Sequence, residues 1–262
     1  MSLAEFEENT ALVTGAGSGI GKAAALRLAR GGAFVGLLGR TEDELQETLV
    51  EIRAVGGDGK VLVADVSNAD AMSEAVRLLL EARKGLHIVV VNAGINGTWA
   101  PIDDLKPEEF DSTVAVNLRG TYLTLHHTVP HMKRGGGSII VVSSINGTRT
   151  FTTPGATAYS ATKAAQLAMV QQLALELGRY GIRINAVCPG AIDTEIDDNT
   201  RTRKKRQAEV PVVFPEGDIP LTGGEAGTAA EVADVIAFLA SGASRHVTGT
   251  PIWVDGGQSL LR

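Results

Sequence analysis

The chain has 262 residues, of which 44% are hydrophobic and 21% are charged, and its formal net charge is −6. This composition is typical of a soluble globular protein, and the acidic balance argues against bulk nucleic-acid binding. No run approaches the ~18 apolar residues of a membrane span, and a single cysteine, Cys188, excludes an internal disulfide.

Short β-rich runs alternate with longer helical patterns, which predicts βαβ units around a parallel sheet. The predicted strands are 11–13, 34–38, 61–64, 87–91, 138–142, 183–187 and 251–254. The predicted helices are 19–30, 42–55, 69–83, 107–132, 156–180 and 229–240. Capping boxes are expected at Thr41 with Glu44 and at Thr228 with Glu231.

Segment 194–227 interrupts this alternation because it is rich in charge, proline and glycine. Loops of this length inside compact domains are usually functional, so we predict one domain over residues 1–262 with a substrate lid at about 194–227. The N-terminal residues lack the basic and apolar regions of a signal peptide, and we expect a cytoplasmic protein.

A glycine-rich turn, TGAGSGIG at residues 14–21, follows the first predicted strand and opens the first predicted helix. Glycines let the backbone approach a phosphate, and a helix N-terminus supplies N–H donors to it. The turn is not a P-loop, because Ala16 and Ala23 replace the glycine and the hydroxyl residue that a P-loop needs. The nucleotide contacts are predicted at Gly15, Gly17, Ser18, Gly19, Ile20 and Gly21.

Arg40 and Thr41 follow the second strand, where a dinucleotide fold usually presents an acidic residue to the ribose. No carboxylate at this position would repel a 2′-phosphate, and a guanidinium can pair with one. We therefore favour NADP(H), with NAD(H) as the second choice. Arg40 as a solvated helix-start residue is the competing interpretation.

Two later strand ends carry further candidates. Asp65 and Val66 follow the third strand, where the carboxylate could hydrogen-bond adenine or be an ordinary strand-end residue. Asn92, Ala93 and Gly94 follow the fourth strand, where small residues suit either a close cofactor or a tight turn.

Tyr159 and Lys163 are four residues apart in a predicted helix and therefore share one face. A phenol with a pKa of about 10 is a poor acid or base near neutral pH. A neighbouring ammonium stabilises the phenolate, so we expect Lys163 to lower the pKa of Tyr159 into the working range.

These motifs, with Asn117, Ser144, Pro189-Gly190 and the VDGG sequence at 254–257, occur in the order that is typical of one family. The chain resembles a compact one-domain short-chain dehydrogenase/reductase, of the 3-oxoacyl reductase type, from about residue 10 to about residue 257. The resemblance implies an α/β Rossmann-like fold, with a seven-stranded parallel sheet of order 3-2-1-4-5-6-7 and helices on both faces.

The same resemblance implies an enzyme that interconverts a secondary alcohol and a ketone with a nicotinamide cofactor, and Arg40 favours NADP(H) as that cofactor. No metal is expected, because the sequence has no His-Glu-x-x-His pattern. The resemblance also implies that Asn117, Ser144, Tyr159 and Lys163 are catalytic, with Ser143 as the alternative serine. Tyr159 and Lys163 would also contact the cofactor, as would Pro189, Gly190, Ile192 and Thr194. A homotetramer acting on a small carbonyl or alcohol substrate is expected. A regulatory or scaffold protein that binds NAD(P) without turnover is the alternative.

The substrate is left open by the sequence. The interval from Ser144 to Tyr159 is longer than is common in the family, so the 146–149 stretch is expected to reshape the pocket mouth. The expected pocket border is Trp99, Ile145, Asn146, Phe151 and Thr153, and Trp99 as ordinary packing is equally favoured. The basic run 201–206 is interpreted as a solvated helix face, or else as a site that attracts a phosphate-bearing or acidic partner.

Overall fold

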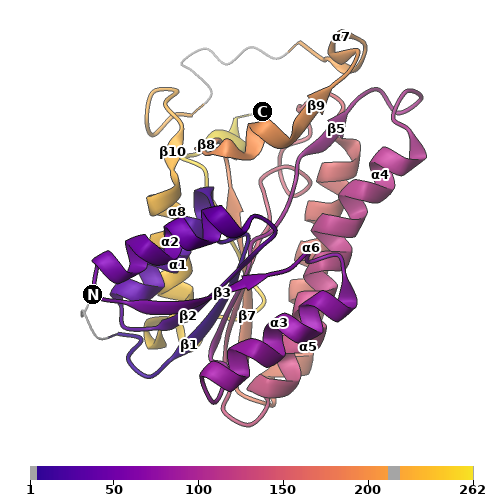
Figure 1. Cartoon of the computed structure of the whole chain (residues 1–262). Coiled ribbons are helices and arrows are strands. Elements are labelled where there is room, and N and C mark those ends of the chain that lie inside the picture. Colours follow the sequence, from indigo (N-terminus) through magenta and orange to yellow (C-terminus); the bar gives the residue numbers. More distant parts are fainter. Residues whose placement is uncertain (1–4, 212–218, 262) are drawn as a thin grey trace.

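The computed structural model describes residues 5–211 and 219–261, without the side chains of Asp197 and Asp198. A seven-stranded parallel sheet has the order β11-β7-β6-β4-β1-β2-β3, which confirms the predicted fold class and strand order (Figure 1). Its strands are β1 (Thr10–Thr14), β2 (Phe34–Gly39), β3 (Asp58–Val63), β4 (Ile88–Val91), β6 (Gly137–Val142), β7 (Ile182–Pro189) and β11 (Pro251–Val254).

Helices cover both faces of this sheet. In Figure 1, α1, α2 and α8 lie on one face, and α3, α5 and α6 lie on the other. The helices are α1 (Gly19–Arg30), α2 (Glu42–Ala54), α3 (Ala69–Ala82), α4 (Pro107–Val114), α5 (Gly120–Met132), α6 (Thr157–Gly178), α7 (Lys205–Ala208) and α8 (Ala229–Ala240).

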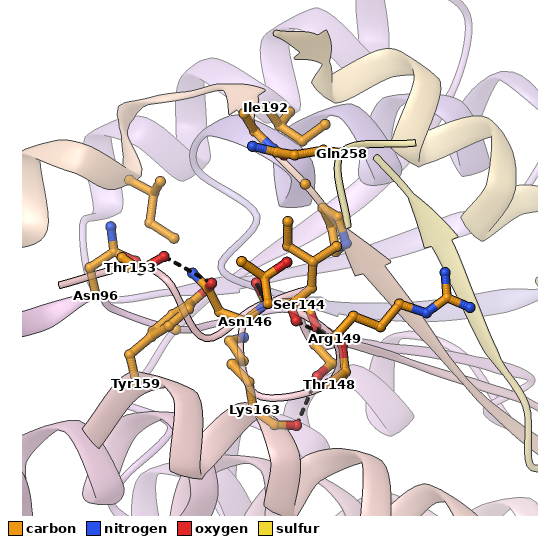
Figure 2. A pocket seen from close by; sticks show the side chains of 18 of the residues that line it. Asn96, Ser144, Asn146, Thr148, Arg149, Thr153, Tyr159, Lys163, Ile192 and Gln258 are labelled. Atoms are coloured by element: carbon orange, nitrogen blue, oxygen red, sulfur yellow. Dashed lines mark hydrogen bonds between the residues drawn. The ribbon is translucent and has the colours of Figure 1, made fainter. Parts of the chain in front are cut away.

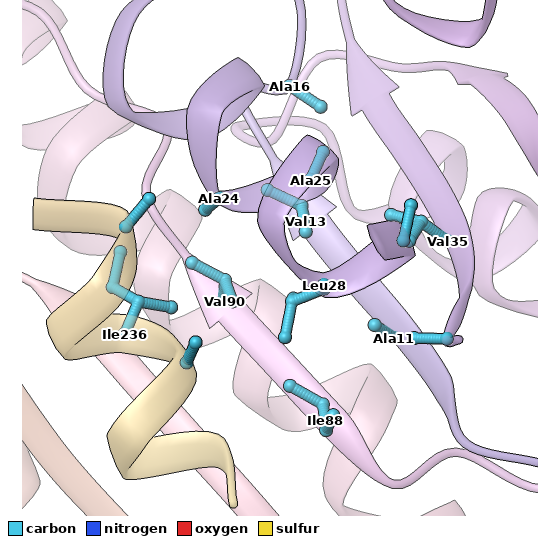
Figure 3. Close-up of a cluster of buried hydrophobic side chains, with 14 of the residues drawn as sticks. Ala11, Val13, Ala16, Ala24, Ala25, Leu28, Val35, Ile88, Val90 and Ile236 are labelled. Atoms are coloured by element: carbon cyan, nitrogen blue, oxygen red, sulfur yellow. The ribbon is translucent and has the colours of Figure 1, made fainter. Parts of the chain in front are cut away.

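The strands are apolar on both sides because both sides are covered. All five residues of β1 are buried, with Val13 packed in the cluster under α1 and α8 and Leu12 in the cluster under α3 and α6. Figure 3 shows the first cluster, to which α1 contributes Leu28 and α8 contributes Ile236, on either side of Val90 of β4. This two-sided core fixes the ends of the strands from which the site is built.

One predicted capping box forms and the other does not. Thr228 Oγ1 accepts from Glu231 N at 3.3 Å, and Glu231 Oε2 accepts from Thr228 N at 2.7 Å. The box at Thr41 is wrong, because the Thr41 side chain makes no cap hydrogen bond. Glu44 instead lies against the glycine-rich turn, so close that a Cβ on Gly17 would be 2.7 Å from its Oε2.

The predicted continuous helix 107–132 is interrupted. A π-helical turn, Ala115–Arg119, separates α4 from α5. Such a turn adds one residue to the helix and commonly marks a functional position. Asn117 is in this turn and is fully buried.

Two short pairs of parallel strands were not predicted. β5 (Gly97–Trp99) pairs with β9 (Thr200–Thr202), and β8 (Ile192–Asp193) pairs with β10 (Gly227–Thr228). Both pairs tie segment 194–227 to the rest of the fold, although residues 212–218 of the predicted lid lie outside the described residues. In the described ranges, no helix is long and apolar enough to span a membrane.

Candidate active site

The glycine-rich turn adopts a conformation that its glycines make accessible. Gly15 and Gly19 have φ values of +68° and +51°, which disfavour side chains. A Cβ on Gly21 would lie 2.0 Å from the carbonyl oxygen of Gly15, so only glycine lets α1 begin this close to β1. The backbone N–H groups at the start of α1 are thus held where a phosphate could bind, which fits a dinucleotide.

Thr14 and Asn92 lock this turn against β4. Thr14 Oγ1 accepts from the backbone N–H of Asn92 at 2.9 Å and of Ala93 at 3.1 Å. Asn92 Nδ2 donates to the carbonyls of Thr14 and Gly15 at 3.0 and 3.3 Å. The Asn92 side chain therefore supports the turn, as the tight-turn interpretation requires. Sequence reasoning assigned Thr14 no role, because a strand-end threonine carries no distinguishing pattern.

The ends of β2 and β3 bring Arg40 and Asp65 together. Asp65 Oδ1 accepts from the backbone and hydroxyl of Ser67 at 2.8 and 2.7 Å. The pKa of Asp65 is lowered: burial opposes the change, but the bonds from Ser67 and the Arg40 charge outweigh it. Thr41 is exposed beside Arg40, whereas the Val66 side chain is buried against Gly120. Arg40 is thus an exposed cation directly after β2.

Two adjacent serines end β6 and have different partners. Ser143 Oγ donates to the carbonyl of Lys163 at 2.8 Å, which commits it to anchoring α6. Ser144 Oγ accepts from the backbone N–H of Asn146 at 3.1 Å, and it lies near enough to Tyr159 to lower the pKa of the phenol. The structure therefore brings Ser144, rather than Ser143, to the phenol.

Tyr159 and Lys163 lie on the same face of α6. In Figure 2 both side chains extend from the helix toward Ser144, and Lys163 Nζ is 5.5 Å from the centre of the Tyr159 ring. Lys163 Nζ donates to the carbonyl of Val142 at 2.9 Å. Both residues are buried while lining the same cavity.

The expected effect of Lys163 on the pKa of Tyr159 is wrong for this geometry. Burial raises the pKa of Tyr159 above its usual value, the hydrogen bond with Ser144 lowers it, and Cys188 raises it further. Burial also lowers the pKa of Lys163 to about 8, because the ammonium is held away from water against one carbonyl. Cys188, fully buried on β7, has a pKa raised to about 11 by the same burial.

Asn117 connects the π-helical turn to the loop after β4. Its Oδ1 accepts from Ile95 N at 2.8 Å, and its Nδ2 donates to Ile95 O at 2.9 Å and to Thr162 Oγ1 at 3.2 Å. A Cβ on Gly94 would lie 3.3 Å from Asn117 Oδ1 and 3.6 Å from Lys163 Nζ. Two of the four predicted catalytic residues, Asn117 and Lys163, therefore lie beside Gly94, and the Asn117 amide is bonded as its structural interpretation requires.

The ends of β7 and β11 close the other side of the cavity. Gly190 N donates to Val254 O at 3.0 Å, and Gln258 Oε1 accepts from Ala191 N at 2.9 Å. After β8, Thr194 contacts the glycine-rich turn, since a Cβ on Gly19 would lie 3.2 Å from its side chain. Pro189, Gly190, Ile192 and Thr194 all line the cavity with Ile20, Asn92 and Gly94. Gln258 was missed because only its place after the VDGG sequence could have indicated it.

The cavity has a volume of about 1140 Å³ and includes the whole expected pocket border, Trp99 among it. Asn146, Thr148 and Arg149 of the 146–149 stretch line it too, with Arg149 stacked 3.4 Å above the ring centre of Trp253. Figure 2 shows Arg149 pointing away from Tyr159 and Lys163. Lys205 of the predicted lid also lines the cavity, as does Asn96, which no pattern in the sequence indicated.

The basic run is not one solvated helix face. Residues 200–202 form β9, and α7 begins only at Lys205. Arg203 forms ion pairs with Asp104 and Glu109, and Lys204 pairs with Asp104. The charges of Arg203 and Lys204 are therefore neutralised by carboxylates of the same chain. These carboxylates are far from the basic run in the sequence, so no local pattern indicated the pairing. Among the described residues, no group of His, Cys, Asp and Glu is arranged to hold a metal ion.

The arrangement matches known proteins over nearly the whole chain. A solved 3-ketoacyl-ACP reductase from Sinorhizobium meliloti 1021 is 62% identical, with a TM-score of 0.94, covering 97% of this chain and 100% of that one. A glucose 1-dehydrogenase from Gluconobacter oxydans (strain 621H) is 37% identical, covering 97% of this chain and 93% of its own. A 3-ketoacyl-(acyl-carrier-protein) reductase from Brucella melitensis, solved with NADH, is 33% identical with a TM-score of 0.85, covering 97% of this chain and 99% of that one.

A family model described as Enoyl-(Acyl carrier protein) reductase matches residues 15–259. With the sheet order, the glycine-rich turn and the Ser144, Tyr159 and Lys163 group in place, the chain belongs to the short-chain dehydrogenase/reductase family.

Proposed function

We propose that the chain is an NADP(H)-dependent oxidoreductase that interconverts a secondary alcohol and a ketone, with Tyr159 as the general acid and base. One observation carries the proposal. Ser144, Tyr159 and Lys163 line a single cavity that continues to Ile20, at the glycine-rich turn. A nicotinamide and a carbonyl group could therefore meet beside the phenol.

The cofactor would be held by the turn 14–21, by the loop at Gly94 and by Pro189, Gly190, Ile192 and Thr194. Ile20, Gly94 and the last four line the cavity, and Gly15 and Gly21 tolerate no side chain. A bound nicotinamide dinucleotide supplies or accepts the hydride. Lys163 and Tyr159 would contact its ribose.

The protein's own residues move the proton. In ketone reduction, Tyr159 Oη holds a proton and donates it to the carbonyl oxygen. Ser144 Oγ donates a hydrogen bond to that oxygen and stabilises its developing negative charge. Tyr159 is 7% exposed, so little bulk water reaches this position. Asn117 acts as a positioning residue, because its amide holds Ile95 next to Gly94; a proton-relaying water beside it remains a prediction.

The preference for NADP(H) rests on Arg40. It is exposed after β2, and its charge acts on Asp65 at the neighbouring strand end. A 2′-phosphate placed near this guanidinium would gain a charge-assisted hydrogen bond. The Brucella melitensis relative that was solved with NADH supports NAD(H) as the second choice.

For the substrate, we propose 3-oxoacyl thioesters as the first candidates, because the chain is 62% identical to a solved 3-ketoacyl-ACP reductase. The glucose dehydrogenase likeness makes a sugar the second candidate. The one-domain organisation, the lid, the homotetramer and the cytoplasmic location remain predictions from sequence and resemblance.

The test is steady-state turnover of NADPH with a 3-oxoacyl thioester, simple ketones and sugars. Tyr159→Phe should lose at least ~100-fold in kcat, the usual size of a general acid–base contribution. Tyr122→Phe is the matched control, because it removes a phenol that is 52% exposed on α5. Near-full activity of Tyr159→Phe would refute the mechanism. Cofactor binding without turnover on any substrate would favour a regulatory or scaffold protein.

A further inference from the structure

Residues 195–208, here called the arm, lie against the segment 95–109 that borders the cavity. β5 and β9 pair in parallel, with Trp99 opposite Thr202. Asn96 Nδ2 donates to Thr200 Oγ1 at 2.8 Å, and Arg203 N donates to Trp99 O at 2.9 Å. The cavity-lining residues Asn96, Trp99 and Lys205 therefore belong to one connected wall.

Arg203 secures this wall with an ion-pair network. Its two terminal nitrogens bind the two oxygens of Glu109 in parallel, at 2.8 and 2.9 Å. The guanidinium also bonds to the carboxylate and the backbone carbonyl of Asp104. The bonds from Arg203 lower the pKa of Glu109 to about 2, so the carboxylate stays charged. Parallel Arg–carboxylate bonds fix direction as well as distance, which a single lysine contact does not.

These contacts join the arm to Asn117 of the predicted catalytic tetrad in a closed ring of interactions, here called the circuit. Glu109 is in α4, which runs directly into the π-helical turn that carries Asn117. Asn117 holds Ile95, and the following residue, Asn96, holds Thr200 of the arm. Three residues further along the arm, Arg203 returns to Glu109. Each link uses a different part of the chain, so only the three-dimensional structure reveals the circuit.

The backbone after Arg203 shows that the arm is held under constraint. Lys204 has φ of +49°, a left-handed conformation that non-glycine residues rarely adopt. Such a conformation persists where surrounding contacts impose it, and conformations of this kind cluster at functional sites. Here the Lys204 side chain pairs with Asp104, next to the Arg203 contacts. The next residue, Lys205, starts α7 and lines the cavity.

We propose that Arg203 is a positioning residue for the substrate: its ion pairs with Asp104 and Glu109 hold the wall formed by Asn96, Trp99 and Lys205 in register with Asn117 and Tyr159. This inference rests on the proposed function. It assigns to the basic run an intramolecular role in substrate affinity. Arg203 touches no reacting atom, so the effect falls on substrate binding and not on the proton transfer.

The kinetic test compares Arg203→Gln with Arg201→Gln. Arg201 is in the same run, is exposed, and has no ion pair among the described residues. Arg203→Gln should raise KM for the carbonyl substrate ~10-fold or more, because small misplacements of positioning groups are costly. KM for the cofactor and kcat should change less than ~3-fold, and Arg201→Gln should leave all three within the same limit. Arg203→Lys keeps the charge without the parallel bonds and should be intermediate.

A double-mutant cycle tests the pair itself. Glu109→Gln should raise the same KM, and the Glu109→Gln/Arg203→Gln double variant should be no worse than Arg203→Gln, within ~2-fold. Multiplied effects would show that the two residues act separately and would overturn the circuit. Equal kinetics of Arg203→Gln and Arg201→Gln would overturn the proposal, as would a loss confined to kcat.

A second readout needs no turnover. The chain has two tryptophans, so Trp253→Phe leaves Trp99 as the only one. In that background Arg203→Gln should shift the Trp99 emission, and Arg201→Gln should not. An unchanged spectrum would overturn the positioning role. If the wild-type protein turns over no carbonyl compound, the proposed function fails, while the emission shift still decides whether Arg203 holds the wall.

Discussion

Replacing Lys163 with methionine should make the protein more stable at neutral pH while abolishing most of its activity. Lys163 is 4% exposed. Among the described residues, its ammonium forms a hydrogen bond only to the carbonyl of Val142. Burial lowers its pKa from the ordinary 10.5 to about 8. Methionine fills nearly the same space without a charge.

The magnitude follows from linkage. At about 1.4 kcal/mol per pH unit, keeping this ammonium protonated in the fold at pH 7 costs about 3 kcal/mol. Losing one hydrogen bond to a buried carbonyl costs about 1 kcal/mol. The net gain for Lys163→Met at pH 7 is therefore about 2 kcal/mol in the free energy of unfolding.

The sign of the pH dependence is also fixed. The folded-state pKa of about 8 lies below the unfolded value of 10.5. Between these values the unfolded chain binds more protons, so wild-type stability rises with pH there and is flat below about 8. Lys163→Met lacks this rise, and its advantage should disappear by about pH 10.

Urea unfolding of both proteins from about pH 7 to about pH 10 measures the difference. Lys60→Met is the matched control, since Lys60 is half-buried and also donates to a backbone carbonyl, Leu78 O at 3.1 Å. Parallel stability curves for Lys163→Met and wild type across this range would refute the reasoning.

Three further outcomes are expected. Arg40→Gln should lower kcat/KM for NADPH at least ~10-fold and for NADH less than ~3-fold, because only NADPH has a 2′-phosphate to pair with the guanidinium. Equal losses for the two cofactors would contradict this. Gly21→Ala should cost at least ~2 kcal/mol of stability and weaken NADPH binding, because its Cβ would lie 2.0 Å from Gly15 O. Gly178→Ala, with no atom within 4 Å of its Cβ, is the control, and calorimetry with cofactor titration measures both. Alcohol oxidation should rise with pH well above neutrality, because it needs the phenolate and burial raises the pKa of Tyr159; a plateau near neutral pH in kcat/KM would count against that role.

The sheet was predictable because its strands are short apolar runs between strongly periodic helices. Helix α1 begins and ends at the predicted residues, and the glycine-rich turn defines its start. The π-helical turn was not predictable, since one additional residue barely changes the apolar spacing across 107–132. The Thr41 capping box failed because Glu44 found a tertiary neighbour, Gly17, which a local motif does not include.

Ser144, Tyr159 and Lys163 could be named from the sequence, but their electrostatics could not. The four-residue spacing correctly put Tyr159 and Lys163 on one face, yet burial, a property of the folded chain, governs the pKa of both. The basic run was misread for a similar reason. Arg203 and Glu109 are 94 residues apart, and no local pattern indicates that they meet.

The thiol of Cys188 gives the chain a native chemical label for its own unfolding. It is the only cysteine, it is fully shielded on β7 between β6 and β11, and its high pKa keeps it protonated. Alkylating reagents attack the thiolate, so modification must wait until β7 separates from β6 and β11. The rate of alkylation therefore reports how often the strands beneath Ser144 come apart, without any engineered probe.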